Sequence, residues 1–372
     1  MREHTYTRIL FATMAVVVGA FLAFAFTHPA EHPAVKPVAE ATSTSTQAKK
    51  PGASTSTSTT AKTTASSSTS TSTSASPSAS PTPEVSVQPL LDPAEKYLGV
   101  AQDGVPNSMT GLTTLSKQIG KTPDLVAYYV PWGEPLNQTW VLNITNDGAM
   151  PLIQFEPDTP SIADIAGGAS DAYATTLADT IKNLNVPVVF SFGHEMNGNW
   201  FAWGTTGTTP ANFVTAWKRI HNIFTKAGAT NVIWLWDVNV TYPVPDVELE
   251  PLYPGDAYVD WIGLTGYYNV GNGGRSTFDT LFEPTMDEVR DFTQKPFLIA
   301  ETAVSPSSEK PQEISNLFAN VADHSDVLGF VWFNYDKSGT NEADWMLDSD
   351  PLSASTFASL AKGSQWGFHI NP

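Results

Sequence analysis

Short apolar runs rich in Val, Ile and Phe recur roughly every 25 to 40 residues along most of this 372-residue chain. Stretches with the apolar spacing of helices, such as 172–183 and 211–227, separate several of them, and this alternation is typical of a parallel sheet. Eight units of this kind predict a single closed (β/α)8 TIM barrel of the α/β class, with its functional residues at the carboxyl ends of the strands. An open doubly wound sheet is the alternative, although no glycine-rich nucleotide-binding loop follows the first run. The expected strands span residues 97–100, 125–130, 151–155, 186–192, 232–236, 261–267, 296–300 and 328–333.

The sequence before the barrel has two parts. Arg2 and Arg8 precede an apolar run, so residues 1–28 are expected to be a signal peptide or a membrane anchor. Ser and Thr supply 27 of the 42 residues between 42 and 83, and residues 29–91 are therefore expected to be a disordered Ser/Thr/Pro-rich linker. Either interpretation of the first segment predicts an extracellular domain over residues 92–372, secreted or tethered to the outer face of the membrane.

The charge balance excludes several partners for this domain. From residue 92 onward, 33 acidic residues stand against 13 basic ones, which argues against nucleic acid and against an anionic membrane surface. Any membrane contact is therefore expected only through an uncleaved N-terminal segment. The chain has no cysteine, so it has neither disulfides nor a thiolate metal site. A monomer is expected.

A metal or other cofactor is not expected either. His194 and Glu195 resemble the start of a zinc-protease helix, but Gly198 stands where that motif requires its second histidine. The other histidines after residue 92 form no ligand pair with His194 or with one another.

Two glutamates instead follow strongly apolar runs. Glu195 lies just after the fourth expected strand, and Glu301 follows the seventh. A carboxyl group at the end of a buried strand is costly without a partner or a task. Strands four and seven lie nearly opposite each other across a barrel, and two carboxyl groups placed so are the proton donor and nucleophile that a glycosidase needs.

The residues around these glutamates resemble a known family. The sequence around Glu195 is similar to the signature of glycoside hydrolase family 26, which is best known for endo-β-1,4-mannanases. Further similarity lies in residues 253–264, in residues 231–236 and at Glu301. The signature reads Gly193-His194-Glu195-Met196-Asn197-Gly198-x-Trp200-x-x-Trp203-Gly204.

This resemblance implies a retaining endo-glycosidase that cleaves a β-linked polysaccharide, with Glu195 as acid/base and Glu301 as nucleophile. Tyr267, or its neighbour Tyr268, is expected to donate a hydrogen bond to Glu301, and His194 is expected to contact substrate or position Glu301. The further expected substrate-binding residues are Asn197, Trp200, Trp203, Trp236, Asn239 and Trp332.

The expected substrate is β-1,4-mannan, but alternatives stay open. Many family members have an arginine where this chain has Ser191, and a tryptophan near the position of Phe155. These departures leave both glutamates intact and bear on sugar recognition. A β-1,3-1,4-glucanase or another exopolysaccharide hydrolase of the same family is one alternative. A tethered carbohydrate-binding barrel without activity is a second, and a surface structural protein is a third.

Overall fold

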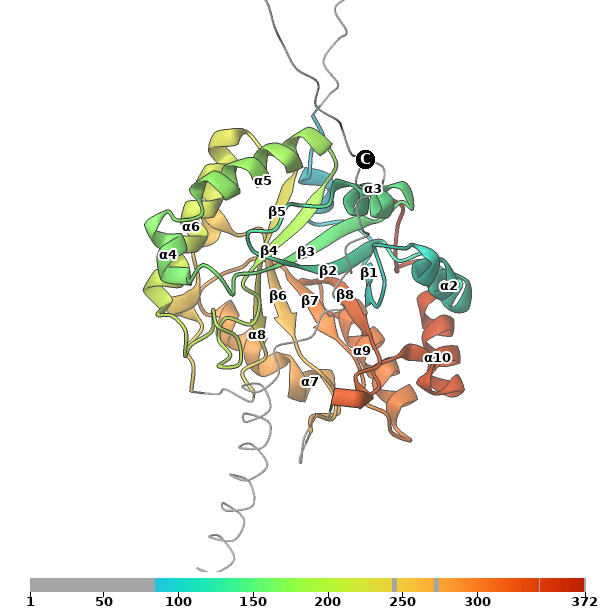
Figure 1. Cartoon of the computed structure of the whole chain (residues 1–372). Helices are drawn as coiled ribbons and strands as arrows, with labels where there is room; N and C mark the ends of the chain where they lie inside the picture. Colours follow the sequence, from blue (N-terminus) through green and yellow to red (C-terminus); the bar gives the residue numbers. More distant parts are fainter. Residues whose placement is uncertain (1–83, 243–245, 271–273, 341, 371–372) are drawn as a thin grey trace, which may run out of the picture. The chain divides into compact units, whose positions relative to one another are not determined.

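Eight parallel strands close into a barrel with helices on the outside (Figure 1). The computed structural model describes residues 84–242, 246–270, 274–340 and 342–370. Each strand pairs with the next, and β8 pairs with β1 from Tyr97 opposite Gly329 to Gln102 opposite Asn334. The predicted TIM barrel is therefore confirmed. Its strands are β1 (Tyr97–Gln102), β2 (Leu125–Pro131), β3 (Met150–Glu156), β4 (Val188–Phe192), β5 (Val232–Asn239), β6 (Trp261–Thr265), β7 (Phe297–Thr302) and β8 (Val327–Asn334).

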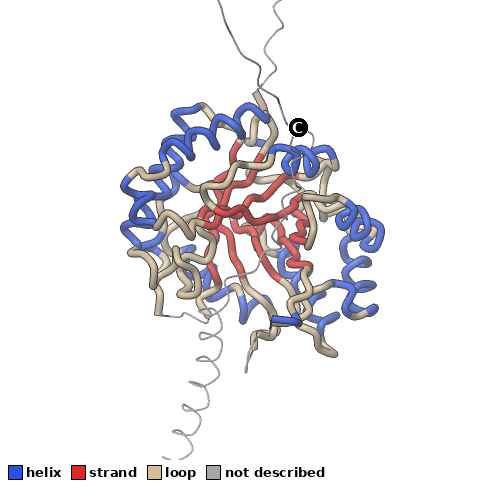
Figure 2. Tube along the Cα trace, in the orientation of Figure 1, coloured by secondary structure: helices blue, strands red, loops and turns tan. Residues whose placement is uncertain are grey.

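Helices form the outer layer around the barrel (Figure 2). The helix from 210 to 227 shows how the sequence sets the ends of a helix: Thr209 caps its first turn, Pro210 occupies the start, and Gly228 ends it in a left-handed conformation. Described helices are α2 (Thr110–Ile119), α3 (Gln138–Asn146), α4 (Ile162–Gly167), α5 (Asp171–Leu184), α6 (Pro210–Ala227), α7 (Phe278–Leu281), α8 (Glu283–Arg290), α9 (Lys310–Asp323) and α10 (Pro351–Ala361). Short 3-10 turns are η1 (Gln88–Leu90), η2 (Glu250–Leu252), η3 (Asp256–Tyr258), η4 (Ser338–Thr340) and η5 (Leu347–Ser349).

All eight predicted strands are present, with shifted ends. β4 begins at Val188 and not at residue 186, because Pro187 has no N–H for the ladder. β5 runs on to Asn239, and β7 runs on to Thr302, so that Glu301 lies within the strand rather than after it. The extended ends bring polar side chains to the carboxyl-terminal mouth of the barrel.

The described chain starts at the opposite end of the barrel. The Val85 N–H donates to Asn185, which follows α5, while Tyr97 and Trp261, each at the start of a strand, donate to the carbonyls of Leu90 and Leu91. The packed region thus begins before the predicted boundary at residue 92. The predicted signal or anchor segment and residues 29–83 of the predicted linker lie outside the described residues. Within the described part, no helix is long and apolar enough to cross a membrane.

Closure of the barrel between β8 and β1 depends on a glycine. A Cβ atom at Gly329 would lie 2.2 Å from the carbonyl oxygen of Tyr97, well inside contact distance. We predict that Gly329→Ala lowers the free energy of unfolding by about 3 kcal/mol, because β8 must move away from β1. Gly339→Ala is the control, since an added Cβ there meets no atom within 4 Å. Equal denaturation midpoints for the two variants would contradict this account.

Candidate active site

Glu195 occupies a tight turn directly after β4. Its φ is +53°, which is uncommon for a residue with a side chain, and Gly193 before it has φ +61°. The Glu195 N–H donates to the carbonyl oxygen of Asp237 on β5 at 2.8 Å, which fixes the turn to the neighbouring strand. Such left-handed residues cluster at functional sites, where the surrounding structure holds them in place.

The Glu195 carboxyl group is buried and accepts two hydrogen bonds. Asn239 Nδ2 donates to Oε1 at 2.8 Å, and Trp200 Nε1 donates to Oε2 at 2.6 Å. Burial, followed by the charge of Glu301, raises the pKa of Glu195 to about 8, although both hydrogen bonds oppose this shift. Glu195 therefore keeps its proton at neutral pH.

Glu301 on β7 has a different environment. The hydroxyl of Tyr129 on β2 donates to Oε2, and the hydroxyl of Tyr267 after β6 donates to Oε1. Burial raises the pKa of Glu301 above its usual value, although these two hydrogen bonds and the charge of Lys337 oppose the shift. Burial and the charge of Glu301 also raise the pKa values of both tyrosines, so both remain donors.

The two carboxyl groups thus have opposed preferences. Glu301 has two hydroxyl donors and a cation that favour its charged form, whereas the negative charge of Glu301 favours the neutral form of Glu195. Environments that separate two pKa values in this way assign acid and base roles within a pair of carboxyl groups. The site can hold one proton on Glu195 and one negative charge on Glu301.

Aromatic rings surround the pair. Trp200 and Phe201 are partly exposed, and the Phe201 ring lies 5.1 Å from the ring of His194. On the other side, Trp345 packs against Tyr267 with ring centroids 4.6 Å apart. Flat apolar faces next to carboxyl groups and amides are typical of sugar-binding sites, where a ring stacks and its hydroxyls form hydrogen bonds.

The structure brings most of the predicted residues together. Trp200 and Asn239 donate to Glu195, and Tyr267 rather than Tyr268 donates to Glu301. The charge of Glu301 acts on Glu195 and so links these two hydrogen-bonded sets. The buried ring of His194 lies 5.7 Å from the ring of Tyr129, whose hydroxyl bonds to Glu301.

Asn197 and Trp203 are buried behind the residues that surround Glu195. Asn197 is fully buried, and its side chain forms two hydrogen bonds with the backbone of Asn239. Trp203 is 1% exposed, stacks on Phe201 at 4.3 Å and donates to the carbonyl of His194. Both were predicted to bind substrate. In the structure their side chains instead hold the backbone of Asn239 and of His194 in place.

Trp236 and Trp332 were also predicted to bind substrate, and the structure places them elsewhere. Successive strand residues point to opposite faces, so Trp236 points away from the interior that Asp237 and Asn239 occupy. Trp236 packs on Tyr253 and donates to the carbonyl of Leu252. Trp332 is 2% exposed, packs on Phe357 of α10 and donates to the carbonyl of Trp345. Both rings lie between the barrel and its outer layer.

The sequence reasoning missed three residues. Tyr129 lies near the carboxyl end of β2, and this position was a usable signal. Phe201 lies inside the signature itself, between two tryptophans. Trp345 lies in an irregular segment between β8 and α10, and no periodicity points to it.

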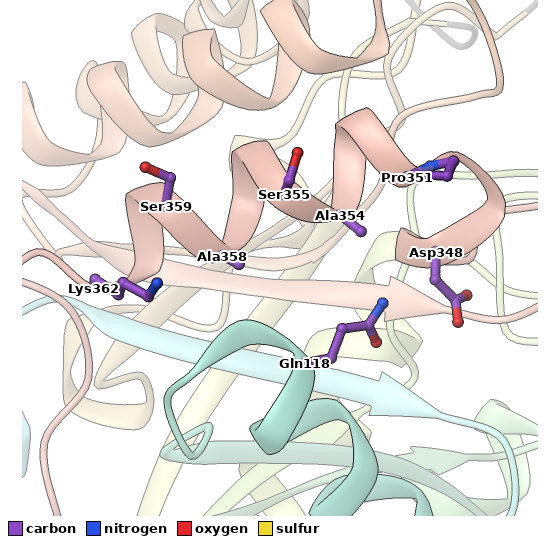
Figure 3. A pocket seen from close by; sticks show the side chains of 8 residues that line it. All are labelled: Gln118, Asp348, Pro351, Ala354, Ser355, Ala358, Ser359 and Lys362. Atoms are coloured by element: carbon purple, nitrogen blue, oxygen red, sulfur yellow. The ribbon is translucent and has the colours of Figure 1, made fainter.

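Two further features of the described residues bear on this site: their capacity to hold a metal ion and a groove on the outside of the barrel. Among the described residues, no group of three or more His, Asp or Glu side chains could hold a metal ion. A groove on the outside of the barrel, between α2 and α10, is lined mainly by small side chains and contains no aromatic ring (Figure 3). Its lining residues are Gln118, Asp348, Pro351, Ala354, Ser355, Ala358, Ser359 and Lys362.

Comparison with known proteins identifies relatives of this domain. Residues 120–293 match the family model of Glycosyl hydrolase family 26. Endoglucanase H of Acetivibrio thermocellus is 28% identical over 263 residues, which cover 67% of this chain and 28% of that protein. A mannan endo-1,4-beta-mannosidase of Bacillus subtilis is 30% identical over 154 residues, which cover 38% of each protein. The chain therefore spans less than two fifths of the length of these two relatives.

The fold has relatives among solved structures as well. A family 26 β-mannanase from Bacteroides ovatus matches with a TM-score of 0.56 at 18% identity, covering 76% of this chain and 92% of that one. The resemblance read from the sequence is thus confirmed. By its matched residues, the barrel domain of this chain is similar to glycoside hydrolase family 26.

Proposed function

We propose that this protein is a retaining endo-glycosidase that hydrolyses a β-linked polysaccharide. The observation that supports the proposal most directly is the pair of buried carboxyl groups with opposed environments, Glu195 beside an amide and an indole, Glu301 beside two tyrosine hydroxyls. The match of residues 120–293 to the Glycosyl hydrolase family 26 model supports the same reaction class.

The two groups would act in two steps. First, Glu195 gives its proton to the glycosidic oxygen while a Glu301 oxygen attacks the anomeric carbon, so that the glycosidic bond breaks and a glycosyl ester forms. Second, the Glu195 carboxylate takes a proton from water, the water oxygen attacks the anomeric carbon, and Glu301 leaves as a carboxylate. Tyr129 and Tyr267 hold Glu301 in place and stabilise its charge whenever it is free.

For the substrate we propose β-1,4-mannan, with a β-glucan such as β-1,3-1,4-glucan as the second candidate. The Bacillus subtilis relative is named a mannan endo-1,4-beta-mannosidase, which supports the first. Endoglucanase H aligns over a larger share of the chain, which supports the second. The N-terminal apolar run and the Ser/Thr-rich tract support export of the domain. Such polymers are met outside the cell.

A panel of polysaccharides tests the activity. We expect reducing-sugar release from mannan exceeding that from mixed-linkage glucan, β-1,3-xylan and carboxymethylcellulose, and its loss in Glu195→Gln and Glu301→Gln. Higher activity on mixed-linkage glucan than on mannan would make β-1,3-1,4-glucan the proposed substrate. Binding of a polysaccharide without hydrolysis would show a carbohydrate-binding barrel, and neither binding nor hydrolysis would defeat both.

Chemical rescue tests the two roles. Glu301→Ala should slow hydrolysis of all natural substrates by several orders of magnitude, since no glycosyl ester can form. Glu195→Ala should retain its first step on an aryl glycoside with an activated phenolate, which needs little protonation, and stall at the second. Added azide should then yield the β-glycosyl azide with Glu195→Ala and the α-anomer with Glu301→Ala. The reverse pattern of anomers would exchange the two assignments.

The tyrosines give a test in pH dependence. A donor hydrogen bond stabilises ionised Glu301, so its removal in Tyr129→Phe or Tyr267→Phe raises the pKa of Glu301. The acidic limb of kcat/KM should move to higher pH, and kcat/KM should fall by about 10- to 100-fold. Tyr268→Phe is the matched control, because that hydroxyl is directed to Asn316. An acidic limb that moves equally in all three variants would rule out a specific role.

A further inference from the structure

A third carboxyl group lies inside the barrel, below the pair already described. Asp237 on β5 is fully buried, and both of its oxygens accept hydrogen bonds. Gln154 Nε2 on β3 donates to Oδ2 at 2.9 Å, and the Thr265 hydroxyl on β6 donates to Oδ1 at 3.3 Å. Gly263, which pairs with Asp237 across β5 and β6, leaves room for it, since a Cβ there would lie 2.7 Å from the Cβ of Asp237. The interior is thus shaped around this side chain.

Asp237 is coupled to both members of the pair. Its own carbonyl oxygen holds the backbone of Glu195, and its charge contributes to the raised pKa of that residue. Burial, with a further contribution from Glu301, raises the pKa of Asp237 itself to about 7, against the hydrogen bonds from Gln154 and Thr265. The groups that donate to it from β3 and β6, Gln154 and Thr265, are neutral, and the charged group that acts on it is Glu301.

We propose that Asp237 is a positioning residue whose negative charge keeps the proton on Glu195. The hydrogen bonds to both of its oxygens stabilise the ionised form, which disfavours a second negative charge on Glu195. In the resting site the proton then stays on Glu195. After Glu195 has given up that proton, the same charge makes its carboxylate a stronger base towards water. This role rests on the proposed function of Glu195 as acid/base.

The test measures the Glu195 proton directly. In protein labelled with ¹³C at the glutamate carboxyl carbon, the Glu195 signal is the one lost in Glu195→Gln. Asp237→Asn keeps the shape of the side chain and removes its charge, so the pKa of Glu195 should fall by about half a unit or more. Asp124→Asn is the matched control, because Asp124 is buried at the opposite end of the barrel, where it accepts from the N–H groups of Leu98 and Phe368. An unchanged Glu195 titration in folded Asp237→Asn would overturn the proposal.

A second variant covers the case in which Asp237→Asn does not fold. Asp237→Ser also removes the charge and adds no bulk beside Gly263, so the pKa of Glu195 should again fall by about half a unit or more. An unchanged Glu195 titration in folded Asp237→Ser would equally overturn the proposal.

Kinetics separate this inference from the proposed function. With an active enzyme, Asp237→Asn should move the basic limb of kcat/KM to lower pH, whereas a purely structural loss would lower kcat without moving the limb. If the wild-type protein hydrolyses no polysaccharide, the proposed function fails, and the two titrations still decide whether Asp237 controls the Glu195 proton.

Discussion

The negative charge of Glu301, which favours the protonated form of Glu195 in the mouth of one apolar barrel, is the constraint around which the site is arranged. Two negative charges cannot both be accommodated there without donors or cations, so the surroundings must decide which group is charged. Two hydroxyl groups favour the charged form of Glu301: that of Tyr267, which follows the neighbouring strand β6, and that of Tyr129 on β2, across the barrel. The amide of Asn239 and the indole of Trp200 hold Glu195 in position without supplying a cation.

The positions of these side chains depend on two buried residues behind them, Asn197 and Trp203. Asn197 fixes the backbone of Asn239 from both sides, and Trp203 fixes the carbonyl of His194, so the signature segment folds onto the end of β5. Residues of this kind touch no reacting atom. They nevertheless determine whether a carboxyl group lies within reach of a glycosidic oxygen, since small displacements of a catalytic group are costly in rate.

Sequence reasoning could locate the strands and both glutamates because each depends on local pattern. Apolar runs indicate the strands, and an acidic residue at the end of such a run indicates a carboxyl group whose burial costs free energy. The same reasoning misplaced Trp236 and Trp332, because a tryptophan near a strand end faces either the interior or the helices, and one residue of register decides which. Trp345 was out of reach for another reason: its contact with Tyr267 joins an irregular segment after β8 to the end of β6. Asp237 lies one residue beyond the apolar run that was taken as the fifth strand.

The contacts of Val85, Leu90 and Leu91 tie the first described residues to the amino-terminal end of the barrel. Glu195 and Glu301 lie at the opposite, carboxyl-terminal ends of the strands. Changes at Val85, Leu90 or Leu91 would therefore act on the stability of the barrel without touching the carboxyl pair.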